Sequence, residues 1–202
     1  MATRLDRDPV YIAGVAETPL GEVHDHSELS MVALAAREAL DEAGMTLADV
    51  DAVFTNYMGD EGSAQVAEYL GVVPRYADST NIGGASYEAH VHHAMLAIAA
   101  GRCEVALIAY ASRQRSRRVR AVGATDETSS LMRQFETPYG LPEPIGYYAM
   151  AAARHMHEFG TTSAQLAEVA VAARAWASMN PKAWDRDPLT IEDCLASRPI
   201  RY

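Results

Sequence analysis

One segment of this chain, DSTNIGGASYEAHVHHAMLAIAAGRCEVALIAYAS at residues 78–112, limits the folds open to it more than any other. It has the pattern of a strand end, a turn through Gly83 and Gly84, an apolar helix and a strongly apolar second strand. A strand, a helix and a strand in this order favour a right-handed crossover between parallel strands. Turns of this kind can present a nucleophile at their tip in α/β enzymes. Here the tip, Ile-Gly-Gly-Ala, carries no cysteine, serine or threonine.

The rest of the chain repeats this alternation of strands and helices. Apolar runs with β-branched residues predict strands, and apolar residues at helical spacing between a cap and a glycine predict helices. Ser27 precedes a helix that Gly44 ends, and Thr162 or Ser163 is expected to cap a later one. The pattern predicts an α/β fold with a mostly parallel sheet covered by helices on both faces. The expected strands are 10–19, 48–57, 75–82 and 103–112, and the expected helices are 28–44, 61–71, 86–101, 145–160, 162–180 and 190–197.

Composition excludes several classes of protein. The 202 residues carry a formal charge of −10, with a pI of about 5.1, which argues against a nucleic-acid-binding protein. The longest apolar-rich run, 94–111, is interrupted by Arg102 and Glu104, and the N-terminus has no signal-peptide pattern. Cys103 and Cys194 show neither metal-ligand nor disulfide spacing. We therefore expect a cytoplasmic protein with no metal site and no membrane span.

Several of these segments together resemble the thiolase superfamily, specifically its sterol-carrier-protein-X-type branch. The resemblance is carried by VYIAGVAETPLG, LAAREALDEAGMTLADVDAVF, TNIGGAS and the long block from FETPYGLPEP to RPI. It implies a thiolase-like αβαβα architecture, of which this chain supplies the N-terminal half with an inserted helical loop domain. The implied division is an α/β core at 1–112, an acyl-CoA-binding loop domain at 113–190, and a return to the core with a linker at 191–202.

The chain departs from the thiolase pattern in two places. Thiolases carry a nucleophilic cysteine three residues after an asparagine of the turn, and here Gly84 stands three residues after Asn81. Glycine has no side chain, so acyl-enzyme chemistry at this position is impossible. Ser86 is either a substitute nucleophile or an ordinary residue of the first helical turn. The GHP histidine and second cysteine of the family's C-terminal half are absent, and RPIRY ends where that half would begin, which favours a fragment over a stand-alone half.

Within the superfamily, the chain looks most similar to the thiolase-like aldolases of steroid side-chain degradation. The resemblance implies retro-aldol cleavage of a β-hydroxyacyl-CoA, with no covalent acyl-enzyme and no cofactor, since coenzyme A is part of the substrate. It also implies acid and base tyrosines largely from the C-terminal half, a homodimer, and a small partner protein with an OB-fold and a zinc ribbon. Two alternatives remain open: a non-catalytic scaffold or acyl-CoA-binding subunit, and a thiolase (acetyl-CoA acyltransferase) that uses another nucleophile.

A dense basic run lies in this otherwise acidic chain. Guanidinium groups pair with phosphate oxygens, so the run is a candidate clamp for the phosphates of coenzyme A. It is equally well explained as a solvated loop or as a contact for an acidic partner. The arginines concerned are Arg113, Arg115, Arg117, Arg118 and Arg120.

Tyrosines and histidines supply the remaining candidates. Tyr139, Tyr147 and Tyr148 fall in the implied loop domain, where each is an acid, a base, an oxyanion donor or a packing group. His90 and His93 share one helix face three residues apart, without the HExxH pattern of a zinc site. Buried or interface histidines are therefore expected in preference to a metal pair.

Overall fold

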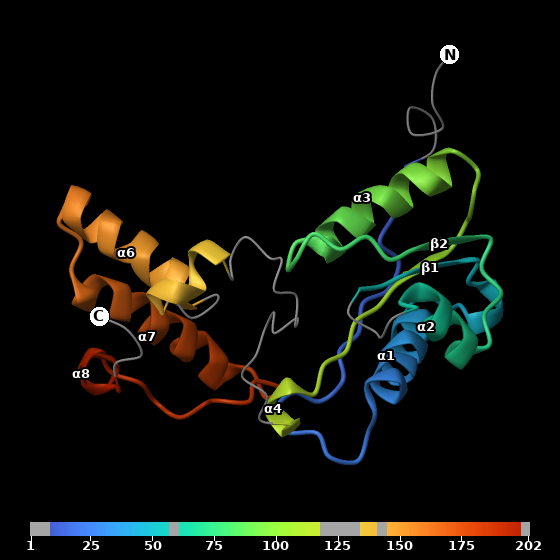
Figure 1. Ribbon diagram of the computed structural model, residues 1–202. Helices are drawn as coiled ribbons and strands as arrows, with labels where there is room; N and C mark the ends of the chain where they lie inside the picture. Colours follow the sequence, from blue (N-terminus) through green and yellow to red (C-terminus); the bar gives the residue numbers. More distant parts are fainter. Residues whose placement is uncertain (1–8, 57–60, 118–133, 141–144, 199–202) are drawn as a thin grey trace. The chain divides into compact units, whose positions relative to one another are not determined.

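The computed structural model describes residues 9–56, 61–117, 134–140 and 145–198, which form two compact units (Figure 1). The first unit is Met1–Arg117 and the second is Arg118–Tyr202. The first contains α1 (Glu28–Glu42), the 3-10 helix η2 (Leu47–Asp49), β1 (Ala52–Phe54), α2 (Ser63–Leu70), β2 (Tyr76–Asp78), α3 (Ser86–Ala99), β3 (Ala106–Ile108) and α4 (Gln114–Arg117). The second contains the 3-10 helix η3 (Thr137–Tyr139), α6 (Ile145–Phe159), α7 (Ser163–Met179) and α8 (Ile191–Ala196). The division of binding roles at residues 112 and 190 stays a prediction.

Three parallel strands form the sheet of the first unit, in the order β2-β1-β3. Val53 of β1 pairs with Ala77 of β2 on one side and with Leu107 of β3 on the other. α2 connects β1 to β2 and α3 connects β2 to β3, as parallel pairing requires, because each strand must return to the same end of the sheet. The expected α/β fold with a parallel sheet is confirmed.

Successive side chains of β1 point to opposite faces of the sheet, and a hydrophobic core lies on each face. Val53 packs with α1 and α2 on one face, whereas Ala52 and Phe54 pack with α3 on the other. Figure 1 shows the same layering, with α3 on one side of the strands and α1 and α2 on the opposite side. All three β1 residues are fully buried, and burial of a valine or phenylalanine side chain contributes about 1.5–3 kcal/mol. β1 is therefore the centre of the unit.

The N-terminal segment 10–19 is not a strand, so this part of the sequence prediction was wrong. Gly14 passes so close to α1 that a Cβ added to it would lie 1.9 Å from the carbonyl oxygen of Ala39. The Val15 amide donates to the Glu42 carboxylate at 2.8 Å instead of to a neighbouring strand. β-propensity expresses how well side chains pack beside other strands, and this segment lies along a helix instead.

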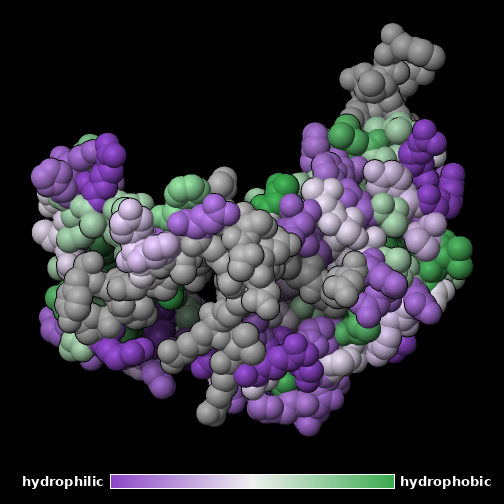
Figure 2. Space-filling model, in the orientation of Figure 1, coloured by the Kyte–Doolittle hydropathy of each residue, from purple (hydrophilic) through white to green (hydrophobic). Residues whose placement is uncertain are grey.

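α7 and α8 are well capped, but the helices of the second unit bury little within the described part of the chain. The Thr162 side chain accepts the Gln165 amide at 3.3 Å at the start of α7, which confirms the expected cap. In α6 and α7, Gly146 and Ala167 are the buried residues, and large side chains such as Trp176 stay exposed. Figure 2 accordingly shows hydrophobic residues among the hydrophilic ones at the surface. None of the described helices combines the length and apolarity that a membrane crossing needs.

Candidate functional site

A tight turn at residues 81–86, which we call the glycine elbow, leads from β2 into α3 (Figure 1). Gly83 has a φ of 77°, in the left-handed region that glycine adopts freely. Its amide donates to the side-chain oxygen of Asn81 at 3.1 Å, which closes an Asx-type turn. The elbow lies at the carboxyl end of the parallel strands, the edge at which open parallel sheets bind ligands. The turn expected from the sequence is thus present and is the candidate site.

The buried side chain of Ser86 stabilises the elbow through hydrogen bonds. Its side chain is fully buried, and its Oγ donates to the Gly83 carbonyl oxygen at 2.6 Å. The same Oγ accepts the Ile82 amide at 3.0 Å and Asn56 Nδ2 at 2.8 Å. One donated and two accepted hydrogen bonds use the full capacity of a hydroxyl group. The proton that a nucleophilic serine would give to a base is engaged within the turn, so this geometry supports a structural role for Ser86.

Side chains at the carboxyl ends of β1 and β3 tie these strands to each other and to α3. The Tyr87 hydroxyl donates to the Asn56 carbonyl oxygen at 2.7 Å, and Thr55 Oγ1 donates to the Ala109 carbonyl oxygen at 2.7 Å. The rings of Tyr87 and Tyr110 lie 5.2 Å apart between centroids. Sequence reasoning missed Asn56 and Tyr87. The available signal was a polar residue directly after a buried strand, on the edge where parallel sheets gather functional side chains.

The tip of the elbow carries no group that can form an acyl-enzyme. Its exposed residues are Asn81, Ile82, Gly84 and Ala85, none of which has a hydroxyl, thiol, amine or carboxylate. Ala85 is also the N-cap of α3, and its side chain cannot bind the first amides of the helix. The exposed side chains of the elbow therefore cannot accept an acyl group.

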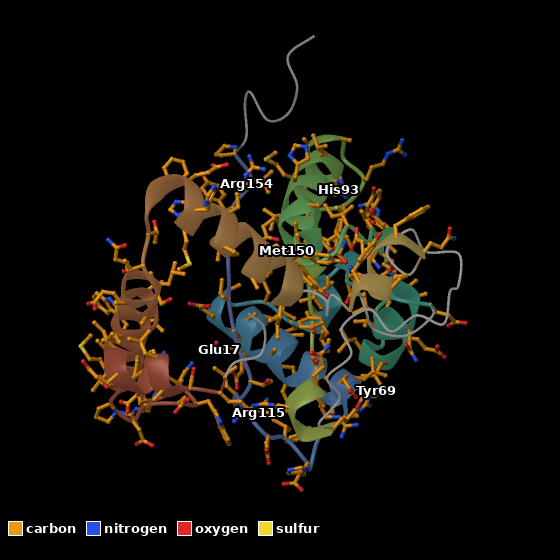
Figure 3. All side chains as sticks on the ribbon, turned by 60° about the vertical axis from the view of Figure 1, so that its left-hand side comes forward. Glu17, Tyr69, His93, Arg115, Met150 and Arg154 are labelled. Atoms are coloured by element: carbon orange, nitrogen blue, oxygen red, sulfur yellow. The ribbon has the colours of Figure 1, made fainter. Side chains whose placement is uncertain are left out.

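Two histidines of α3 fasten the segment that precedes the elbow. His93, shown on α3 in Figure 3, has its Nδ1 2.7 Å from Asp78 Oδ2. His90 is fully buried, and its Nε2 lies 3.1 Å from the Thr80 carbonyl oxygen, which requires a proton on Nε2. In the parts of the chain that the structure describes, no group of three or more side chains could hold a metal ion. The contacts of His93 and of His90 Nε2 fit the structural role expected for the two histidines, whereas His90 Nδ1 is buried without a hydrogen-bond partner among the described residues.

We expect Asp78 to make the stability of the first unit dependent on pH. Burial raises the pKa of its carboxyl group, but hydrogen bonds from Thr80 and His93 outweigh burial, so the pKa lies below its usual value. A lowered folded-state pKa stabilises the fold above the unfolded-state pKa of about 4, and this contribution is lost as pH falls through the folded-state value. We therefore expect the difference in unfolding free energy between wild type and Asp78→Asn to shrink as pH falls from about 7 to about 3.

Urea denaturation across this pH range measures the effect, with Asp41→Asn at an exposed position of α1 as the control. A difference between wild type and Asp78→Asn that stays constant with pH would contradict the role given to the Asp78 carboxylate.

Two of the expected coenzyme A arginines pair with a carboxylate of the first helix. Arg117 Nη2 lies 2.8 Å from Glu28 Oε1, and Arg113 Nε lies 3.2 Å from Glu28 Oε2. Glu28 is the first residue of α1, so these ion pairs tie α4 to the start of that helix. Arg115 is exposed on α4, as Figure 3 shows. The pairing gives Arg113 and Arg117 a structural partner, while phosphate binding by the run stays a prediction.

The Glu28 pairs allow a matched test of phosphate binding. Arg118 and Arg120 lie outside the described residues, so the test uses Arg113 and Arg117. If these two bind phosphate, replacing both with glutamine weakens coenzyme A binding by about tenfold or more per lost contact. The loss should be unequal for coenzyme A and dephospho-coenzyme A, as measured by calorimetry.

Glu28→Gln is the control, because it breaks the same ion pairs and keeps both arginines. It should leave coenzyme A binding unchanged or tighter. If Glu28→Gln and the double arginine variant weaken binding alike, the arginines act only by holding α4 against α1.

The three candidate tyrosines lie in the second unit. Tyr139 and Tyr148 are 87% and 73% exposed. Tyr147 is half-buried, and its hydroxyl donates to the carboxylate of Glu136. A carboxylate acceptor fixes the direction of the phenol, so Tyr147 is the positioned hydroxyl of the three. Sequence reasoning missed Glu136, whose role depends on a contact between two segments eleven residues apart. A catalytic role for any of the tyrosines stays a prediction.

Among curated proteins, the chain is similar to relatives named as an aldolase, a lyase and acetyl-CoA acetyltransferases, although no family model matches it. It is 32% identical to a steroid side-chain-cleaving aldolase of Thermomonospora curvata, over 94% of this chain and 50% of the relative. It is 34% identical to a 17-hydroxy-3-oxo-4-pregnene-20-carboxyl-CoA lyase of Mycobacterium tuberculosis, over 94% and 51%. An acetyl-CoA acetyltransferase of Methanothermobacter thermautotrophicus is 29% identical, over 95% and 51%. The chain thus spans about half the length of the curated relatives it matches.

Solved structures confirm the expected fold. An Ltp2–ChsH2 aldolase superposes with a TM-score of 0.83 at 33% identity, over 94% of this chain and 49% of that chain. A monomeric SCP2-thiolase-like protein type 1 from Mycobacterium smegmatis shares the fold, with a TM-score of 0.62 at 22% identity, over 93% and 39%. The chain thus has a thiolase-like fold, and in sequence it is similar to steroid side-chain-cleaving aldolases.

Proposed function

We propose that this chain is part of a thiolase-like lyase that cleaves a carbon–carbon bond of a β-hydroxyacyl-CoA. The observation that carries the proposal is an elbow whose interior is fully hydrogen-bonded while its tip at Gly84 has no nucleophile. Similarity to two relatives that are named an aldolase and a lyase supports the same reaction class. The chain spans about half of each relative. The proposal therefore includes a catalytic site to which residues outside this chain also contribute.

The reaction balances without a covalent intermediate. A general base removes the proton of the β-hydroxyl group, and the oxygen forms a carbonyl group as the Cα–Cβ bond breaks. The bonding electron pair moves into the thioester as an enolate, which a general acid protonates at Cα. The products are an aldehyde or ketone and a shortened acyl-CoA. No oxidant, reductant or acyl acceptor is consumed, so coenzyme A enters only as part of the substrate.

The elbow contributes orientation and electrostatics to this reaction. α3 begins at Ser86 with no side-chain cap, and its Ser86 amide donates to the Gly83 carbonyl oxygen at 3.1 Å. The positive end of the helix dipole lies beside the tip. Negative charge develops on the thioester oxygen in the enolate, and a fixed dipole stabilises such charge without having to reorganise. Within this chain, Tyr147 is the favoured acid–base candidate because Glu136 orients its hydroxyl. The thiolase resemblance implies further acid–base tyrosines, largely from a C-terminal half.

A steroid side chain attached to coenzyme A is the proposed substrate class, on the basis of the names of the two relatives. The proposed assembly is a homodimer that recruits a partner subunit with an OB-fold and a zinc ribbon. The similarity to an aldolase named for two components, Ltp2 and ChsH2, supports a partner subunit.

A direct test adds a β-hydroxyacyl-CoA to the purified native assembly and measures both products by mass spectrometry. We expect a carbonyl product and a shortened acyl-CoA in equal amounts, with unchanged activity after iodoacetamide treatment. Intact-mass measurement during turnover should show no acyl group on the chain, because Gly84 provides no sulfur. An acyl adduct on any residue of the elbow would contradict the proposal.

A non-catalytic acyl-CoA-binding subunit is the second candidate function. It is favoured by the use of buried polar groups at the elbow, including Ser86 and Asn56, to hold the turn. Such a subunit would bind acyl-CoA in every assembly and release no carbonyl product in any of them.

A further inference from the structure

Asn56, which lies just after the central strand β1, contacts the first two residues of α3. It is 5% exposed, and its Nδ2 donates to Ser86 Oγ at 2.8 Å. Its carbonyl oxygen accepts the Tyr87 hydroxyl at 2.7 Å. These two hydrogen bonds join segments that lie thirty residues apart in the chain. Asn56 therefore fixes the start of α3, and with it the elbow, to the centre of the sheet.

The bond from Asn56 has a direction, and this direction determines where the Ser86 hydroxyl points. An amide nitrogen can only donate, whereas a hydroxyl oxygen accepts twice and donates once. Ser86 Oγ accepts from Asn56 and from the Ile82 amide, so its proton goes to the Gly83 carbonyl oxygen at 2.6 Å. An acceptor at position 56 would attract this proton, and the Gly83 carbonyl oxygen would lose its bond to the hydroxyl.

A polar side chain at this buried position needs a reason other than packing. Burying an amide is costly unless its polar atoms are hydrogen-bonded, and a leucine of similar size would carry no such cost. Asn56 lies at the carboxyl edge of the sheet, where open parallel sheets bind ligands. The exposed tip residues Gly84 and Ala85 directly follow the backbone that Ser86 holds. A change in the Ser86 hydroxyl is therefore passed on to the tip.

We propose that Asn56 is a positioning residue of the elbow. Acting through Ser86, its amide donor holds the backbone of residues 82–83 in the conformation in which the tip meets the acyl group of an acyl-CoA. This inference rests on the proposed lyase function, in which the acyl group lies at the tip. Asn56 itself does not touch the reacting atoms. A misplacement of about 1 Å can lower a rate on the order of 100-fold, so a small shift of the tip is enough to affect turnover.

Two asparagine-to-aspartate substitutions test the direction of the bond. Asn56 uses its nitrogen as a donor, whereas Asn81 uses its oxygen to accept the Gly83 amide. Burial raises the pKa of a carboxyl group, and at position 56 this group can donate only when it is protonated. Relative to wild type, Asn56→Asp should lose about 100-fold in kcat/KM at pH about 8 and only about tenfold at pH about 5. Asn81→Asp keeps an acceptor when ionised, so it should not recover as pH falls.

The native assembly is assayed with β-hydroxybutyryl-CoA for turnover and with unreactive butyryl-CoA for binding by calorimetry. Affinity for butyryl-CoA should follow the same pattern, with Asn56→Asp weaker by about tenfold at pH about 8 and closer to wild type at pH about 5. Wild-type protein that binds no butyryl-CoA would overturn the inference, because no acyl group would then lie at the tip.

Comparison with wild type at each pH removes the titration of the neighbouring groups. The Tyr87 hydroxyl contacts Asn56, and the rings of His90 and Tyr110 lie 5.6 and 5.2 Å from that of Tyr87. Asp78 lies on the neighbouring strand β2. All four groups are present in every variant. Recovery that appears in Asn56→Asp alone therefore belongs to the introduced carboxyl group.

Asn56→Leu covers the case in which Asn56→Asp does not fold. It removes the donor without adding a charge, so the loss in kcat/KM relative to wild type should be about tenfold at both pH values. Thermal unfolding shows whether each variant is folded. A folded Asn56→Leu with the turnover and affinity of wild type would overturn the positioning role. A loss in folded Asn56→Asp that is equal at both pH values would overturn it as well.

Turnover separates this inference from the lyase proposal. Cleavage of β-hydroxybutyryl-CoA yields acetaldehyde and acetyl-CoA. If wild type and both Asn56 variants cleave it equally well, the positioning role fails and the lyase function stands. If wild type cleaves nothing, but the affinity of Asn56→Asp for butyryl-CoA recovers as pH falls, the lyase function fails and Asn56 positions an elbow that only binds acyl-CoA.

Discussion

The Ser86→Ala variant is expected to lose about 3 kcal/mol of unfolding free energy, because a single buried hydroxyl serves three partners in the elbow. The substitution removes an acceptor from Asn56 Nδ2 and from the Ile82 amide, and it removes a donor from the Gly83 carbonyl oxygen. A buried polar group left unsatisfied costs about 1–3 kcal/mol, and groups near the exposed tip recover part of this through water. Guanidinium denaturation measures the difference.

Ser178→Ala is the control for this substitution, since its hydroxyl donates to the Ala175 carbonyl oxygen on an exposed face of α7. The control should change stability by less than about 0.5 kcal/mol. If Ser86→Ala behaves like the control in denaturation but abolishes turnover, Ser86 is a nucleophile after all and the structural role assigned to it is wrong.

The helices of the first unit could be predicted from the sequence because their signals are local. Ser27 caps α1 by accepting the Ser30 amide at 3.1 Å, and Gly71 ends α2 in the left-handed conformation. The N-terminal segment could not be predicted in the same way. An extended apolar segment joins a sheet only if a strand lies beside it in the fold. Segment 10–19 instead contacts Glu42 and the backbone of α1.

The candidate site likewise has features that depend on local sequence and features that depend on residues distant in the chain. The turn at Gly83 and the absent nucleophile at Gly84 are visible in the sequence because each is a property of one position. The role of Ser86 is not visible, because it depends on Asn56, thirty residues earlier in the chain. The arginine run likewise suggests phosphate binding, and only the fold shows that Glu28 lies beside Arg117. Sequence reasoning identified these residues, and their partners required the fold.

β2 is expected to be the strand through which two copies of this chain associate. It stands at the edge of the sheet, and its outer side has no pairing partner among the described residues. An unpaired strand edge exposes amide and carbonyl groups that favour pairing with another chain, so stable proteins rarely leave it open. Ala77 is exposed on this strand, between half-buried Tyr76 and Asp78. A two-fold contact repeats every substitution on both sides, so a charge placed here acts twice.

The Ala77→Lys variant should therefore shift the protein from dimer to monomer in sedimentation velocity at micromolar concentration. Ala77 is a cleaner position than Ser79, because Ser79 Oγ accepts the amide of Ser63, the first residue of α2, at 2.9 Å, and a lysine at position 79 would also remove this hydrogen bond. Ala48→Lys provides the control, as it adds the same charge at an exposed position of η2 before the start of β1. It should leave the dimer intact. Wild-type protein that sediments as a monomer, or an equal shift in both variants, would place any association of this chain somewhere other than the edge of β2.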